Sequence, residues 1–375
     1  MTLSRCLLPV LLAAAATGAC QDAPQVAPSG ETKITITPVA RGLEHPWSLA
    51  FLPDGRMLVT ERPGRLRYVT REGALSDPIA GLPAVYAEGQ GGLLDVVLDP
   101  GFANNSTIYF SYAEPAADDT NGTAVARAHL DGGRLTDLKV IFRQQPKVAS
   151  KQHFGSRLVF ARDGNLFVTT GERNSERAKA QDLTTDLGKI LRITPDGGVP
   201  PDNPFVGRKD ALPEIWSYGH RNSQGATLNP VTGQLWAIEH GPRGGDEINI
   251  PAAGKNYGWP IITYGREYSG PAIGEGTAKA GMEQPIHYWV PSIAPSGMTF
   301  HDGRGFPGWK RQLFVGALAA QQLVRLEVTP EGKVNKEERY AIGKRVRDVR
   351  EGPDGALYLV TDEDAGEILR VVPAN

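Results

Sequence analysis

The chain is poor in cysteine, in surplus charge and in long helical patterns, and each shortage excludes a class of protein. Of 375 residues only two are cysteines, Cys6 and Cys20, and both lie near the N-terminus. The rest of the chain has no internal disulfide, so burial and strand pairing must stabilise it. The formal net charge is −2. Nucleic-acid-binding proteins usually carry a basic excess or stripe, so nucleic acid is excluded as a partner.

Glycine and proline are abundant by contrast, with 44 and 29 residues. This composition favours many short strands joined by turns over a helical fold. The length allows one large domain or two. No linker-like segment recurs after residue 32, so residues 33–375 are expected to form one domain.

The N-terminus has the pattern of an export signal. Arg5 precedes an apolar run that is too short to span a bilayer, and small residues follow it. Cys20 stands where a bacterial lipoprotein has its lipid-modified cysteine, although Thr17 replaces the usual Leu. Lipidation and plain cleavage therefore both stay open. We expect residues 1–20 to be a signal peptide, residues 21–32 a flexible tether, and the protein to be periplasmic or exported, free or lipid-anchored.

A pattern of strand, tight turn and strand returns six times. Residues 158–170 contain an apolar run, Asp163-Gly164 and a second apolar run. This predicts a hairpin, because Asp-Gly tolerates the positive φ of a tight turn. Close or looser copies lie at residues 49–61, 94–112, 226–239, 298–315 and 349–362.

These copies recur every 45 to 70 residues or so, roughly the length of a four-stranded blade with long loops. We therefore predict an all-β fold, a six-bladed β-propeller of four-stranded antiparallel blades. The two ends of the chain could complete one blade together, which would hide otherwise exposed sheet edges.

Two polar residues stand where the repeat does not require them. His153 lies at the mouth of a predicted strand, where an imidazole can face a ligand; a structural or surface histidine is the alternative. Gln90 lies among glycines in the sequence GQGG at residues 89–92. Close backbone approach there would let Gln90 reach a planar ligand, whereas a simple tight loop is the other interpretation.

Arginines and amides form a second group. Arg221, Asn222 and Gln224 lie within four residues and could hold carboxylates and carbonyls, or form a solvated loop. Arg345 and Arg347 would share one face of a strand, because alternate residues point the same way. Neighbouring guanidinium groups repel unless an anion lies between them. Together with Arg221 they indicate a polyanionic ligand, with solvent-facing charge as the alternative.

The segment EHGPRGGDEIN at residues 239–249, followed by NYGWP at residues 256–260, combines acidic side chains with a glycine-bent backbone. Calcium takes six to eight oxygen ligands from carboxylates and peptide carbonyls, which such a segment can supply. The spacing does not match an EF-hand loop.

Taken in order, GQGGLLD at 89–95, GHRN at 219–222 and the two segments above resemble the soluble aldose sugar dehydrogenases that depend on pyrroloquinoline quinone (PQQ), within the glucose/sorbosone dehydrogenase family. The resemblance covers residues 42–372 and implies a six-bladed propeller that binds PQQ and Ca²⁺ at its hub. It implies that His153 is the general base, which deprotonates the anomeric hydroxyl of an aldose while hydride leaves C1 for PQQ, giving a lactone. The external electron acceptor, a quinone or a cytochrome, and the choice between monomer and homodimer stay open.

The resemblance also assigns binding residues. Those expected to contact PQQ are Gln90, Arg221, Asn222, Gln224, Ser292, Ala319, Arg345 and Arg347, with Ala319 offering only its backbone. The carbonyls of Gly241 and Pro242 would hold the calcium beside PQQ, and Glu247 and Tyr257 match ligands of a second, structural calcium. Arginines and a divalent ion suit a flat tricarboxylate that carries a quinone.

Two positions depart from the glucose dehydrogenase branch of this family. Ala319 stands where that branch has a Lys, and Gln152 stands where it has an acidic residue, which favours the aldose branch with its broader substrate range. A calcium-dependent lactonase or other hydrolase is an alternative that would need no redox cofactor, but three arginines speak against it. A non-catalytic sugar-binding propeller is another, against which His153 argues.

Overall fold

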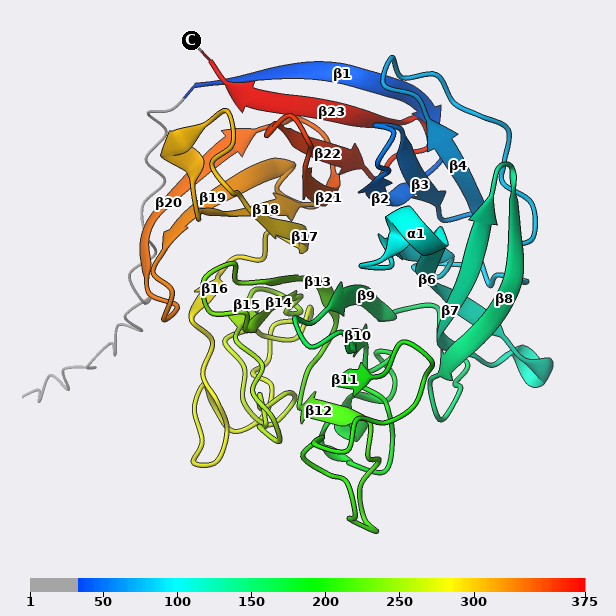
Figure 1. Ribbon diagram of the computed structural model, residues 1–375. Coiled ribbons are helices and arrows are strands. Elements are labelled where there is room, and N and C mark those ends of the chain that lie inside the picture. The colour runs from blue at the N-terminus through cyan, green and yellow to red at the C-terminus, as the bar shows by residue number, and fades with distance from the viewer. Residues whose placement is uncertain (1–32, 375) are drawn as a thin grey trace, which may run out of the picture.

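The computed structural model describes residues 33–374, and these form six antiparallel β-sheets arranged in a ring (Figure 1). Five sheets have four strands and one has three. The predicted six-bladed β-propeller is confirmed. The predicted signal peptide, Cys20 and the tether lie outside the described residues.

Each blade is counted from the hub outward. The innermost strands are β2 (Pro46–Phe51), β5 (Leu93–Leu98), β9 (Gly155–Phe160), β13 (Ser223–Leu228), β17 (Pro295–Phe300) and β21 (Val346–Glu351). The second strands are β3 (Met57–Glu61), β6 (Thr107–Pro115), β10 (Leu166–Thr170), β14 (Leu235–Glu239), β18 (Leu313–Ala317) and β22 (Leu357–Thr361). The third strands are β4 (Arg65–Val69), β7 (Asn121–Asp131), β11 (Lys189–Ile193), β15 (Asp246–Asn249), β19 (Gln322–Val328) and β23 (Gly366–Pro373).

The outer strands are β8 (Arg134–Arg143), β12 (Ile215–Tyr218), β16 (His287–Trp289), β20 (Val334–Ala341) and β1 (Ile34–Leu43). Helical structure in the described part is limited to α1 (Phe102–Asn105) and the 3₁₀ turns η1 (Ala117–Asp119), η2 (Arg177–Gln181) and η3 (Pro307–Trp309). No helix among residues 33–374 has the length and hydropathy needed to cross a bilayer.

The six sequence repeats are the six inner hairpins. Each copy spans the first two strands of one blade, for example β9 and β10 at residues 158–170. The predicted turns have the expected backbone, with φ of 86° at Gly55, 85° at Gly164 and 76° at Gly355. In all three turns the preceding Asp accepts a hydrogen bond from the backbone N–H two residues further on, which fixes the turn.

The blade of β2, β3 and β4 lacks a regular fourth strand. Residues 75–79 run beside β4 instead: Ser76 N–H donates to Tyr68 O at 2.9 Å, and Ile79 N–H donates to Leu66 O at 2.7 Å. The outer edge of this sheet is therefore covered by an irregular segment.

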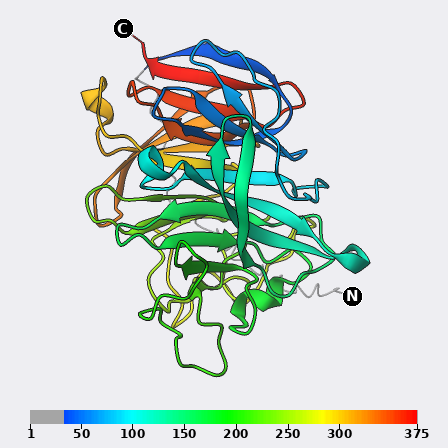
Figure 2. The same cartoon turned by 45° about the vertical axis from the view of Figure 1, so that its right-hand side comes forward.

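The two ends of the described chain complete one blade. β1 pairs along β23, from Ile34 opposite Pro373 to Leu43 opposite Gly366. Both views show blue β1 beside red β23 (Figures 1 and 2). The expectation that the ends share a blade is confirmed, and the pairing closes the ring.

Neighbouring blades pack through apolar side chains and meet closely at the hub. Trp236 of β14 contacts Phe300 of β17 edge to face, with ring centres 5.2 Å apart. At the hub, a Cβ on Gly297 would lie 2.1 Å from Asp348 Oδ1, so only glycine lets β17 approach β21 this closely. A Cβ on Gly225 would likewise lie 2.1 Å from Ser296 O.

Inside the hub lies a buried charge cluster, which we call the hub cluster, of Asp95, Arg157, Asp348 and Arg350. Arg157 Nη1 lies 3.0 Å from Asp95 and 3.1 Å from Asp348. Arg350 bonds to the same two carboxylates at 2.9 and 2.8 Å. Two cations and two anions from β5, β9 and β21 thus balance one another and tie these inner strands together.

Candidate active site

The polar residues selected from the sequence lie at one end of the central channel of the propeller. At this end the inner strands begin and the second strands finish, and the Asp-Gly turns lie at the opposite end. Gln90, His153, Asn222 and Arg345 each lie just before an inner strand, and Arg347 lies within β21. Loop residues from separate blades are therefore brought to one place.

His153 is buried and held from two sides. Its backbone N–H donates to Gln90 Oε1 at 2.9 Å, and its φ is +55°. Its Nδ1 lies 3.0 Å from Glu172 Oε2. A carboxylate only accepts, so Nδ1 carries the proton and Nε2 keeps its lone pair. No residue of the described chain bonds to that Nε2.

The electrostatic surroundings of His153 favour a neutral imidazole. Burial lowers its pKa below the ordinary value; the hydrogen bond that His153 donates to Glu172 raises the pKa in part, and the charge of Arg221 lowers it again. A neutral imidazole with a free Nε2 is in the form that accepts a proton.

Arg221 and Asn222 connect the loop before β13 with its neighbours. Asn222 Oδ1 accepts the N–H of Gly155 at 3.0 Å. Arg221 Nη1 donates to the carbonyls of His240 at 3.0 Å and Gly241 at 3.1 Å. The guanidinium carbon of Arg221 lies 5.3 Å from the ring centre of Trp259.

Gln224 joins two further site residues. Its Oε1 accepts from Arg347 Nη1 at 2.7 Å and from His240 Nε2 at 3.1 Å. Burial holds the pKa of His240 well below its ordinary value, and Arg221 and Arg347 lower it further. His240 is therefore a second neutral imidazole at the site.

Arg345 and Arg347 lie on the same side of the channel, as the strand pattern predicted. Both approach Asp362: Arg347 forms an ion pair with it, and Arg345 Nη2 lies 3.9 Å away. Asp362 also accepts from His45 Nδ1 at 2.9 Å. Arg347 and Arg345 thus depend largely on one shared carboxylate.

The site has fewer anions than its arginines need. The Nε atoms of Arg62, Arg221 and Arg347 are buried without a hydrogen-bond partner in residues 33–374. Buried donors left unpaired are costly, and a charged donor more so. The donor set fits a ligand with several carboxylates.

Ser292 and Ala319 lie at the edge of this constellation. Ser292 Oγ donates to Asp246, with oxygen distances of 2.9 and 2.8 Å, and Asp246 Oδ1 accepts the N–H of Gly241 at 2.8 Å. Ala319 is exposed, and its N–H donates to Ile293 O at 3.2 Å. Ser292 is therefore linked to the loop of Gly241 through Asp246.

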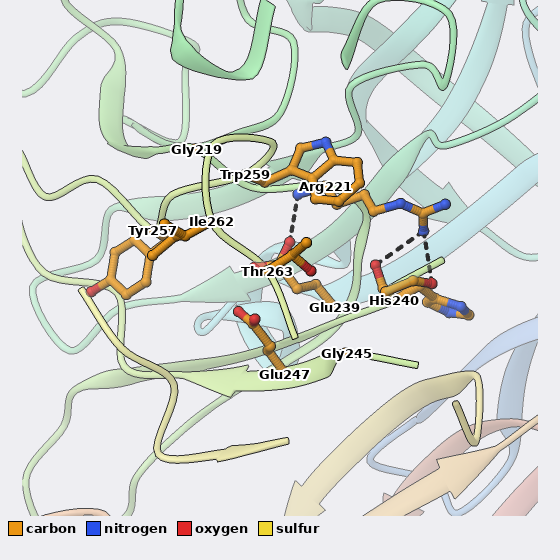
Figure 3. Close-up of a pocket in the computed structure, with 11 residues that line it drawn as sticks. Gly219, Arg221, Glu239, His240, Gly245, Glu247, Tyr257, Trp259, Ile262 and Thr263 are labelled. Carbon is orange, nitrogen blue, oxygen red and sulfur yellow. Dashed lines mark hydrogen bonds between the residues drawn. The ribbon is translucent and has the colours of Figure 1, made fainter. Parts of the chain in front are cut away.

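A small cavity of about 10 Å³ is lined by Arg221 together with acidic, glycine and aromatic residues (Figure 3). Its lining includes Glu239, Glu247, Gly241, Gly245 and Thr263. Burial raises the pKa of Glu247 well above its ordinary value, and Glu239 raises it further. Two buried carboxylates in one cavity, with room for about one small atom, fit a divalent cation.

Two of the predicted calcium ligands, the main-chain carbonyl of Gly241 and Tyr257, already form hydrogen bonds within the protein. Gly241 O accepts from Arg221 at 3.1 Å. The hydroxyl of Tyr257 donates to Ile250 O at 2.7 Å and is directed away from Glu247 (Figure 3). Tyr257 could therefore offer only its main-chain carbonyl to an ion in this cavity.

Four further residues of the site, Glu172, His240, Asp362 and Arg62, were not predicted from the sequence as site residues. A signal for them exists in the repeat. In four blades an acidic residue ends the second strand or follows it within two positions, at Glu61, Glu172, Glu239 and Asp362. Because second strands finish at the end of the channel that holds the site, these carboxylates and the residues after them lie near it.

Comparison with known proteins gives a family match over most of the chain. Residues 43–370 match the glucose/sorbosone dehydrogenase family. The chain is 51% identical over 340 residues to the aldose sugar dehydrogenase YliI of Escherichia coli, which covers 89% of this chain and 91% of that relative.

Two solved structures share the fold closely. The apo-form of the soluble aldose sugar dehydrogenase of Escherichia coli has a TM-score of 0.89 at 48% identity, covering 91% of this chain and 100% of that chain. The PQQ-bound aldose sugar dehydrogenase of Streptomyces coelicolor has a TM-score of 0.77 at 29% identity, covering 92% of this chain and 100% of that chain.

Proposed function

The chain belongs to the glucose/sorbosone dehydrogenase family of oxidoreductases, and we propose that it oxidises aldose sugars at C1 to lactones, with PQQ as cofactor and His153 as general base. One observation carries this proposal: an imidazole with a free Nε2 lies at the same end of the channel as three arginines whose buried Nε atoms have no hydrogen-bond partner in residues 33–374. Hydrolysis of a neutral lactone would not require such a set of cations, which disfavours the lactonase alternative.

The cofactor would be held by side chains from several blades. Arg221, Arg345 and Arg347 would bind its carboxylates, because guanidinium groups match carboxylate geometry. The remaining predicted contacts are Gln90, Asn222, Gln224, Ser292 and the backbone of Ala319. When bound, PQQ supplies the two-electron acceptor for oxidation of the sugar.

His153 would move the proton. Its Nε2 takes the proton of the anomeric hydroxyl as C1 loses its hydrogen with two electrons, and C1 becomes the carbonyl carbon of the lactone. Glu172 would hold the ring in the required tautomer and stabilise the imidazolium that forms, because it accepts from Nδ1 at 3.0 Å. Gln90 would fix the position of the ring through its bond to the His153 N–H.

Calcium would occupy two places. The carbonyls of Gly241 and Pro242 would hold one ion beside the cofactor, where a cation polarises a quinone oxygen. Glu247, with the main-chain carbonyl of Tyr257, would hold a second, structural ion. The two neighbouring carboxylates Glu239 and Glu247 support a cation there, since burial and the charge of Glu239 both raise the pKa of Glu247 when no cation is bound.

We also propose that the leader exports the protein to the periplasm, with Cys20 as the place of a lipid anchor if it is modified. Electrons would then pass from the reduced cofactor to an external acceptor, a quinone or a cytochrome.

The experiment that tests the function adds PQQ and Ca²⁺ to purified apo-protein and follows dye reduction with a panel of aldoses. We expect reduction that requires both the cofactor and a sugar. No cofactor-dependent reduction with any aldose would favour the lactonase or the sugar-binding alternative.

His153→Ala tests the base. We expect PQQ to bind with little change while turnover falls by roughly 10²- to 10⁴-fold, the usual contribution of a positioned base. His129→Ala is the matched control, because His129 lies exposed on β7, away from the site. Turnover of His153→Ala within a few-fold of the unaltered protein would place the base elsewhere.

A further inference from the structure

Arg62 lies near Arg345, Arg347 and Asp362, and its side chain has no hydrogen-bond or ion-pair partner among residues 33–374. It follows Glu61 at the end of β3 and is only partly exposed. Its Nε is buried and unbonded, and its guanidinium forms no hydrogen bond or ion pair with any other residue from 33 to 374. A partly buried arginine without a counter-ion is costly unless a ligand supplies the negative charge.

Hydrogen bonds on both sides of the residue hold the backbone of Arg62 in position, so the point from which its side chain extends is fixed. Its N–H donates to His45 O at 3.1 Å, and its carbonyl accepts from Leu93 N–H at 3.1 Å. Gly92 packs directly against it: a Cβ there would lie 2.3 Å from Arg62 O. Gly92 belongs to the same GQGG loop as Gln90, which contacts His153.

The charges around Arg62 are unbalanced. Burial lowers its pKa, Asp362 raises it in part, and Arg347 and Arg345 lower it again. Asp362 is already bonded to Arg347 and His45. The guanidinium groups of Arg62, Arg345 and Arg347 therefore share the single carboxylate of Asp362, which also accepts a hydrogen bond from His45.

A second arginine that follows a glutamate at this end of the channel allows a comparison. Arg173 follows Glu172 as Arg62 follows Glu61, although Glu61 ends β3 whereas Glu172 lies two residues after the end of β10. Arg173 is fully engaged: it donates to Gln152 O, Asn121 O, Asn121 Oδ1 and Ser150 O, at 2.6 to 3.0 Å. The guanidinium group of Arg173 thus has partners within residues 33–374, whereas that of Arg62 has none there.

We propose that Arg62 is the fourth arginine of an anion-binding wall, which it forms with Arg221, Arg345 and Arg347, and that it binds a carboxylate of the PQQ cofactor. This inference rests on the proposed function. It adds a residue from the blade of β2, β3 and β4 to a site otherwise built on the blades that follow.

The test is direct binding of PQQ to the apo-protein in the presence of Ca²⁺, by titration calorimetry at two salt concentrations. Arg62→Gln should weaken PQQ binding by about 10-fold or more, because a charge-assisted hydrogen bond to a carboxylate is lost. The salt dependence of Kd should become shallower. Arg62→Lys keeps the charge and should lose less.

Arg304→Gln is the control, because Arg304 is an exposed arginine whose ion pair with Asp302 lies at the opposite end of the channel. A urea midpoint for each variant separates loss of binding from loss of fold. A Kd of Arg62→Gln within two-fold of the unaltered protein overturns this inference alone. Failure of the unaltered protein to bind PQQ overturns the proposed function and this inference with it.

Discussion

At the scale of single residues, the state of His153 is set by three neighbours with opposing effects. Burial and Arg221 lower its pKa, and Glu172 raises it. The result is an imidazole that stays neutral at ordinary pH but keeps a partner for the charge it would gain. Such a balance between opposing contributions is typical of general bases.

Glu172→Gln removes the contribution that raises the pKa of His153. The pKa should fall further, so the unprotonated base persists to lower pH and the acidic limb of the profile of kcat/KM against pH moves to lower pH. The maximal rate should fall by less than the loss seen without His153, because the base itself remains. Steady-state kinetics between pH 4.5 and 9 measure both effects.

The control for this variant is Glu331→Gln, because Glu331 is exposed and remote from the site. An acidic limb that stays in place, or moves to higher pH, would contradict the assigned role of Glu172. A lower rate with an unmoved limb would point to a structural effect only.

A site residue can be predicted from the sequence when its neighbours in the chain mark it, and not when its contacts form only in the folded protein. Gln90 and His153 could be predicted because each interrupts a repeat that has no need of it. The partner of His153 could not, because Glu172 reaches the ring only through the fold of its loop. The hydroxyl of Ser292 is turned to Asp246, a contact between residues 46 positions apart that no local pattern encodes.

At the scale of elements, the inner strands form a hub that has little room for side chains. Gly225 and Gly297 have no positive φ, so their conformation alone does not require glycine. The close approach of the neighbouring strand does. Hub glycines are thus determined by packing between blades, whereas Gly55, Gly164 and Gly355 are determined by their turns.

Gly297→Ala should therefore destabilise the protein by about 1–3 kcal/mol, the usual cost of overpacking, because the new methyl group would collide with Asp348. Urea denaturation measures the change. Gly308→Ala is the matched control, because a Cβ there meets nothing within 4 Å. Equal midpoints for the two variants would show that β17 can move away from β21 without cost.

The inner hairpins were predictable because Asp-Gly turns and β-branched strands are local signals. The irregular segment at residues 75–79, which replaces a fourth strand in one blade, was not. Its contacts with β4 use Ser76 and Ile79 in a stretch without alternating hydrophobicity. The hub cluster was also missed, since Asp95, Arg157 and Asp348 pair only when three blades meet.

At the scale of the whole molecule, the predicted ligands act across blades. Residues proposed to bind PQQ lie in or near β3, β5, β13, β17, β18 and β21, and His153 precedes β9. A ligand held by several blades stabilises the ring as a whole, by about 2.7 kcal/mol when its concentration is 100 times its Kd.

We therefore expect PQQ and Ca²⁺ together to raise Tm in differential scanning calorimetry, and chelation with EDTA to reverse part of the increase. Glu247→Gln should abolish the part due to the structural calcium, because it removes one of two buried carboxylates. Glu275→Gln is the control, because Glu275 is an exposed acidic residue that forms an ion pair with Lys279. A calcium-dependent increase that survives in Glu247→Gln would place the ion elsewhere.

The pairing of β1 with β23 also constrains when the molecule can mature during translation. A ribosome makes β1 first and β23 last, so this blade stays one strand short until synthesis is nearly complete. Arg345, Arg347 and Asp362 are attached to the same blade. A nascent chain therefore cannot assemble its anion-binding wall early, whereas a circular permutant opened between β4 and β5 would complete that blade before β2, β3 and β4 are synthesised.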